Sequence, residues 1–109
     1  MKKINSASIT ITKKLANEIN YLLRHGDPSF GEDLTIVKTA VFDNGYEMDI
    51  KCCGVQYEEG EVNTAWTEAV LFHNGSEVCC SDPCDEFVGE WELSDGDNVY
   101  VVNVSVEEE

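Results

Sequence analysis

The feature that most constrains the fold is a period-two pattern in the C-terminal quarter of the chain. In residues 86–93 one set of alternate positions is apolar and the other is mostly acidic: Phe87, Gly89, Trp91 and Leu93 alternate with Glu86, Val88, Glu90 and Glu92. A period of two is typical of a β-strand, because successive side chains point to opposite faces. We therefore predict a strand with a buried face that contains Trp91 and a charged face on the other side.

A second strand is expected to return beside the first. Residues 94–98 form a turn rich in Asp, Gly and Asn, and residues 99–106 then carry an apolar set on one side: Tyr100, Val102, Val104 and Val106. This composition predicts a β-hairpin. The whole stretch 82–109 holds ten carboxylates and no Lys or Arg, and its last three residues, all Glu, are expected to be a frayed tail.

The N-terminal part predicts a short strand followed by a helix. Residues 4–12 are dense in β-branched side chains, which favours a strand. From Lys13 the apolar spacing becomes helical, with one face formed by Leu15, Ile19, Leu22 and Leu23. Thr12 can cap the start of this helix, and Gly26 can end it with Arg24 and His25 in the last turn.

The middle of the chain predicts two more hairpins. Residues 34–42 and 46–52 flank Asp43-Asn44-Gly45, and residues 66–73 and 76–80 flank Asn74-Gly75. A loop at 27–33 and an acidic connector at 56–63 separate these elements. We expect one α+β domain over 1–109, in which an N-terminal helix packs on a mainly antiparallel β-meander of about six strands. It comprises a basic segment 1–26, an acidic sheet 27–106 and the tail 107–109.

Charge is distributed very unevenly. Residues 1–26 hold five Lys and Arg against one Glu, whereas residues 27–109 hold 21 acids against Lys38 and Lys51, which gives a net charge of −15. Solvated surfaces usually mix both signs, because a dense array of carboxylates repels itself. Nucleic acid is the direct partner that we expect least, because the carboxylates would repel its phosphates. We expect a basic protein as the partner.

The acidic positions suggest an array that could imitate a nucleic-acid backbone. The candidate partner-binding residues of the last hairpin are Glu86, Glu90, Glu92, Asp95 and Asp97, and neighbouring strands are expected to extend the same surface with Glu47, Asp49, Glu68 and Glu77. Such an array could occupy a groove lined with Lys and Arg. A merely solvated acidic face and adaptation to high salt are the alternatives.

The five cysteines allow a second interpretation. One member each of Cys52-Cys53 and Cys79-Cys80 could join Cys84, with His73 as a fourth ligand, to hold a tetrahedral zinc ion. The spacing lacks the short gaps of zinc knuckles, so buried cysteines acting as small apolar side chains are favoured and no cofactor is expected. An odd number of cysteines also indicates reduced thiols and a cytosolic location.

The sequence offers no catalytic motif, so we expect a protein that is not an enzyme. His25 and His73 have structural explanations at a helix end and a strand end, and no phosphate loop or nucleophile elbow is present. Phe30 and Tyr57 lie in expected loops and could make exposed contacts. No apolar run reaches the roughly 20 residues that span a membrane, and no secretory leader is recognisable.

In size, acidity and lack of catalytic or metal motifs, the whole chain resembles the small anti-defence proteins of phages and mobile elements. These are anti-CRISPR and anti-restriction inhibitors, several of which are nucleic-acid mimics. The resemblance implies a host nuclease as the partner, inhibited by occupancy in the host cytosol. A general interaction or accessory module, with an acidic face that only keeps it soluble, is the alternative, and a small structural zinc protein is the third.

Overall fold

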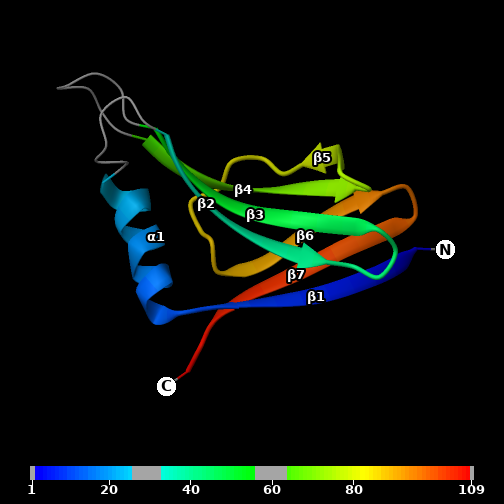
Figure 1. Ribbon diagram of the computed structural model, residues 1–109, viewed down its shortest axis with the longest axis horizontal. Coiled ribbons are helices and arrows are strands. Elements are labelled where there is room, and N and C mark those ends of the chain that lie inside the picture. Colours follow the sequence, from blue (N-terminus) through cyan, green and yellow to red (C-terminus); the bar gives the residue numbers. More distant parts are fainter. Residues whose placement is uncertain (1, 26–32, 56–63, 109) are drawn as a thin grey trace.

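The computed structural model describes residues 2–25, 33–55 and 64–108. Within these ranges one helix and seven strands are present (Figure 1): β1 (Lys3–Ile11), α1 (Lys13–His25), β2 (Asp33–Val41), β3 (Tyr46–Val55), β4 (Thr64–His73), β5 (Ser76–Cys80), β6 (Gly89–Asp95) and β7 (Asn98–Val106). The expected helix and the three expected hairpins are confirmed, and the fold is mainly β.

The strands form two sheets, which differs from the single meander of about six strands that we expected. One sheet has the order β1-β7-β6, and the other has the order β2-β3-β4-β5. Within the first sheet β1 runs parallel to β7, with Ile9 opposite Val104, and all other paired strands are antiparallel. Both sheets have one apolar face, and they bury these faces against each other.

The core lies between the two sheets. Tyr100, Val102 and Val104 come from β7, Met48 and Ile50 from β3, and all are almost completely buried in one cluster. Trp91 joins the cluster from β6 with only 7% of its surface exposed, which confirms the predicted apolar face of the last hairpin. Side chains that alternate with these residues point outward from the sandwich.

The helix α1 covers one end of the sandwich (Figure 1). Ile19 and Leu22 are buried in the core, and Leu15 and Leu23 pack at its edge, as the helical spacing predicts. Thr12 is the N-terminal cap: its hydroxyl oxygen accepts a hydrogen bond from the Leu15 amide at 3.0 Å. The expected cap at Gly26 lies outside the described residues.

The edges of the two sheets lie close together. β1 lies next to β2 on one side of the sandwich, and β6 lies next to β5 on the other. At the second side the Cys79 thiol contacts the Ser94 carbonyl oxygen at 3.5 Å. The chain passes from β5 to β6, and so from one sheet to the other, through residues 81–88, which we call the crossing.

Candidate acidic interaction surface

The crossing begins as a continuation of β5 along β4. The Ser81 amide donates to the Ala69 carbonyl at 2.8 Å, and the Ser81 hydroxyl oxygen accepts from the Ala69 amide at 2.9 Å. Cys84 and Thr67 then exchange two backbone hydrogen bonds of 2.8 Å each. The first half of the crossing is therefore fixed to sheet β2-β3-β4-β5 by its backbone.

Thr67 also holds the second half of the crossing. Its side chain is completely buried, and its hydroxyl donates to the Glu86 carbonyl oxygen at 2.6 Å. Phe87 follows with 3% of its surface exposed, and its carbonyl oxygen accepts from the Trp91 indole nitrogen at 3.0 Å. Glu86 is thus held at the surface between two anchored residues.

Exposed carboxylates follow the crossing and the two strands that it joins. Together they form what we call the acidic edge: Glu77 of β5, Asp82, Asp85 and Glu86 of the crossing, and Glu90 and Glu92 of β6. All six are exposed, and Glu90 and Glu92 point away from the core because the buried Trp91 lies between them. The acidic edge occupies the side of the sandwich where β5 meets β6.

Positive charge lies elsewhere in the fold. On the opposite side, Lys3 belongs to β1 and Lys38 to β2, while Lys13, Lys14 and Arg24 belong to α1. Lys51 of β3 pairs with Glu68 of β4 in the register of the sheet. The acidic edge itself therefore holds no Lys or Arg, whereas β1, β2, β3 and α1 each carry at least one.

Three of the predicted site residues, Glu47, Asp49 and Glu68, do not extend the surface of the last hairpin. Glu47 and Asp49 alternate with the buried Met48 and Ile50, so they point outward from sheet β2-β3-β4-β5. Glu68 and Glu77 share this outer face in the strand register. Glu90 and Glu92 point outward from the other sheet, so the expectation that Glu47, Asp49 and Glu68 continue their surface is wrong. Glu77 differs from these three because it belongs to β5, the edge strand that lies next to β6.

Asp95 and Asp97 also differ from each other. Asp97 is exposed at the β6–β7 turn, whereas the Asp95 carboxylate accepts a hydrogen bond of 2.6 Å from the Tyr46 hydroxyl. That hydrogen bond, with burial, raises the pKa of Tyr46 to about 12. Tyr46 also stacks on Tyr100 with ring centroids 4.5 Å apart. Asp95 therefore links two hairpin ends and contributes less to an open binding surface.

The cysteines do not assemble a metal site in the part of the chain that the structure describes. Cys52 faces the core and Cys53 the outside, and His73 stacks on Tyr46 with ring centroids 4.1 Å apart. No group of three or more His, Cys, Asp or Glu side chains that could hold a metal is found among the described residues. The zinc interpretation therefore gains no support.

The thiols that burial affects are poorly suited to nucleophilic chemistry. Burial raises the pKa of Cys52 to about 11, and it is also the main cause of the raised pKa of Cys53 and Cys79. A nucleophilic cysteine needs the opposite shift, because the thiolate is the reactive form. All five cysteines are free thiols.

Two residues considered as contacts, Phe30 and Tyr57, lie outside the described residues. The sequence pattern did not reveal the role of Thr67, since its hydroxyl meets a carbonyl 19 positions away. In the sequence, this role is indicated only by the position of Thr67, a small polar residue between Trp66 and the apolar run that begins at Ala69.

Comparison with protein-family models, with curated proteins and with solved structures found no match to the chain. Among the described residues, α1 is too short and too polar to cross a membrane.

Proposed function

We propose that this protein is a non-enzymatic inhibitor of a nucleic-acid-processing host protein, such as a CRISPR or restriction nuclease. The acidic edge enters the basic groove in which the target holds its nucleic acid. The observation that carries the proposal is the acidic edge itself, with its six exposed carboxylates on two adjoining strands and a fixed crossing, and no Lys or Arg among them.

Strand geometry gives this surface a regular charge spacing. Residues two apart on a strand are about 6.8 Å apart, so Glu90 and Glu92 are separated by about twice the 3.4 Å of helix axis that each phosphate of one DNA strand occupies. The hydrogen bonds of Thr67 hold Glu86 in a fixed position beyond them. A basic groove would gain affinity and a faster association rate from such an array. Free thiols support action in a reducing compartment, the host cytosol.

The test is capture of partners from a host lysate, followed by binding measurements with the captured protein. Reversing Glu86, Glu90 and Glu92 to Lys should abolish binding, and DNA or RNA should compete with the wild-type protein for the target. Binding should weaken as salt rises.

A matched control is available on the other outer face. The triple reversal of Glu47, Asp49 and Glu68 to Lys changes the net charge by the same amount but leaves the acidic edge intact. It should retain most of the binding. Equal loss from both triple variants would point to net charge alone and would contradict a role of the acidic edge.

The alternative function, a general interaction module, is favoured by exposed apolar side chains on β2. Val41 is 68% exposed and Val37 is 41% exposed, both on the outer face of their sheet. A complex that is insensitive to salt, that Val41→Asp disrupts and that the triple reversal at the acidic edge does not affect would select this alternative.

A further inference from the structure

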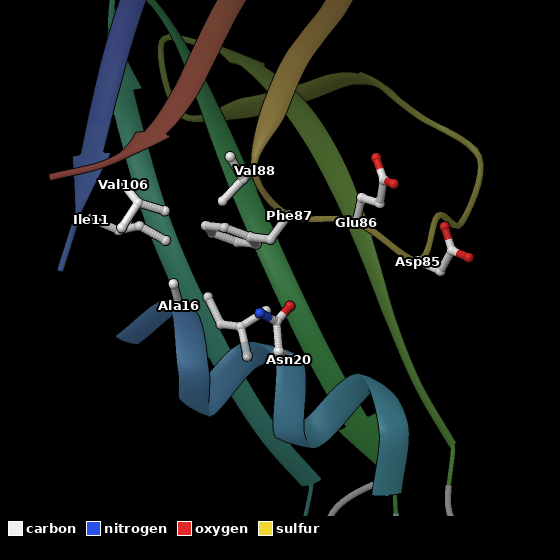
Figure 2. A pocket seen from close by; sticks show the side chains of 9 residues that line it. Ile11, Ala16, Asn20, Asp85, Glu86, Phe87, Val88 and Val106 are labelled. Atoms are coloured by element: carbon white, nitrogen blue, oxygen red, sulfur yellow. The ribbon is translucent and has the colours of Figure 1, made fainter. Parts of the chain in front are cut away.

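A cavity of about 360 Å³ lies between α1 and the crossing, at one end of the acidic edge. Figure 2 shows Ala16 directed into it from the helix and Phe87 from the crossing. Ile11 and Val106, the last residues of β1 and β7, close the far end. The cavity is at the small end of the range for ligand sites, about 300 to 1,000 Å³, so it has room for one or two side chains.

The floor of this cavity is apolar and rigid. Ile11, Ile19 and Phe87 are each at most 3% exposed and belong to the core, so they cannot move without disrupting the fold. The crossing wall is also fixed, because the Thr67 hydroxyl holds the Glu86 carbonyl. A cation that entered would lose its hydration on an apolar floor, and that loss is costly. The floor therefore selects an apolar side chain, and its rigidity lowers the cost of ordering on binding.

Negative charge lies at the mouth of the cavity and outside it. Asp85 and Glu86 are exposed there, and Figure 2 shows their carboxylates directed away from the cavity. None of the described residues that line the cavity is Lys or Arg. A segment that placed an apolar side chain on the floor would bring its neighbouring residues close to these carboxylates. Charge complementarity therefore favours Lys or Arg at the neighbouring positions.

We propose that this cavity receives one large aliphatic side chain, such as leucine, from a basic segment of the partner. The aliphatic side chain packs on Ile19 and Phe87, while Lys or Arg on either side of it stays in solvent near Asp85 and Glu86. Exposed ion pairs contribute little affinity. The buried side chain therefore supplies most of the affinity, and the charges supply orientation and a faster association. The inference rests on the proposed function, because it takes the partner to be a basic protein.

Val88 connects the cavity with the acidic edge. Its side chain lines the cavity and is 43% exposed, so it continues the apolar surface from the floor to the outside. It also lines a second hollow, of about 230 Å³, that lies toward Glu90 and Trp91. Asp85 and Glu86 line both hollows as well, so the crossing forms a ridge between them. A segment anchored in the first cavity would pass over this ridge onto the acidic edge.

The first test uses a capped Lys-Lys-Leu-Lys-Lys peptide as the probe, followed by NMR of the isotope-labelled protein. Amide shifts are expected at Ala16, Asn20, Phe87 and Val88. Replacing the leucine of the peptide with alanine keeps every charge and should weaken binding about tenfold, because less apolar surface is buried. Replacing its four lysines with glutamine should also weaken binding and should remove most of its salt dependence.

Three results of this titration would overturn the proposal. Equal binding of the leucine and alanine peptides would show that the cavity takes no apolar side chain. Equal binding of the lysine and glutamine peptides would show that the occupant need not be basic. Shifts that are absent, or that do not include the residues of the cavity, would place the peptide elsewhere or nowhere on the protein.

Two variants of the protein change the cavity without changing its charge. Ala16→Phe fills the cavity, and Asn17→Phe adds the same ring at an exposed position of the same helix as a control. Val88→Asn makes the mouth polar at an exposed position, so the fold should not be affected, and Val41→Asn is its control at an exposed position of β2. Ala16→Phe and Val88→Asn should both weaken the leucine peptide severalfold, and the two controls should not.

Partner capture then distinguishes this proposal from the function on which it rests. If Ala16→Phe and Val88→Asn retain full partner binding while the triple reversal of Glu86, Glu90 and Glu92 abolishes it, the apolar anchor is refuted and the acidic edge stands. If the leucine peptide binds as described but the triple reversal leaves partner binding unchanged, the proposed function fails and the cavity remains a site for an apolar side chain of a basic segment.

Discussion

Replacing Thr67 with valine tests whether one hydroxyl holds the crossing in place. Valine keeps the shape of the side chain but removes the donor to the Glu86 carbonyl, which lies 2.6 Å from the hydroxyl oxygen. A buried acceptor left without a partner costs about 1 to 3 kcal/mol, and the removal of a buried hydroxyl offsets part of this cost. Because Glu86 is close to solvent and its carbonyl can partly rehydrate, we expect a loss of about 1 to 2 kcal/mol.

Thermal unfolding gives the size of this effect, and hydrogen exchange gives its position. For a domain of about 100 residues, 1 kcal/mol corresponds to roughly 4 to 8 °C in Tm, so Thr67→Val should melt several degrees lower. Faster amide exchange should be concentrated at Cys84 and its neighbours in the crossing, because Cys84 bonds the backbone of the same residue.

Two matched variants make the result specific. Thr67→Ser keeps the hydroxyl and loses one buried methyl group, so it can lower Tm by a similar amount but should leave exchange in the crossing unchanged. Thr39→Val removes a hydroxyl that bonds Asp49 at 2.7 Å on the exposed face, and its effect should stay within about 0.5 kcal/mol. A Thr67→Val protein with wild-type Tm and wild-type exchange in the crossing would refute the reasoning.

Three further predictions concern the protein alone. The free energy of unfolding should fall between about pH 9 and pH 12. Folding raises the pKa of Cys52 to about 11 and that of Tyr46 to about 12. The unfolded chain therefore loses these protons at a lower pH than the folded protein, and rising pH favours unfolding. Tyr46→Phe should show a shallower fall in Tm over that range and should remove the late phase from the ultraviolet titration of tyrosine. Moderate salt should raise Tm by screening the carboxylates of the acidic edge, and a flat response would contradict strong repulsion among them. Thr12→Ala should cost about 0.5 to 2 kcal/mol through loss of the helix cap, measured by denaturant unfolding, whereas Thr10→Ala at an exposed position of β1 should cost less.

The sequence predicted local structure well, because local structure depends on neighbours in the chain. The turns at Asn44-Gly45 and Asn74-Gly75 need backbone conformations that glycine and asparagine adopt easily, and the second has φ values of 51° and 87°. The face of α1 followed from a spacing of three and four residues. Each of these signals lies within a few positions of the structure that it specifies.

The pairing of distant segments could not be predicted in the same way. Alternation identifies the buried face of a strand but does not identify its neighbour, so nothing in residues 3–11 indicates that they pair with 98–106. The same limit applies to the candidate surface. Burial of Phe87 and Trp91 followed from the pattern, but the bond between Tyr46 and Asp95 depends on two turns that the sheets bring together from 49 positions apart.

Acid at an open sheet edge also has a structural explanation. Edge strands expose unpaired backbone groups, and charged side chains on them prevent pairing with other chains. β1 and β2 are edge strands too, each nine residues long, and they carry Lys3 and Lys38. Charge of either sign would therefore protect an edge strand from pairing. A mixture of the two signs would do so without repulsion among carboxylates. Protection also gives no reason for Asp85 and Glu86, which lie on the anchored crossing beside an apolar cavity. A single sign that extends beyond the strands is what the proposed binding to a cationic partner would require.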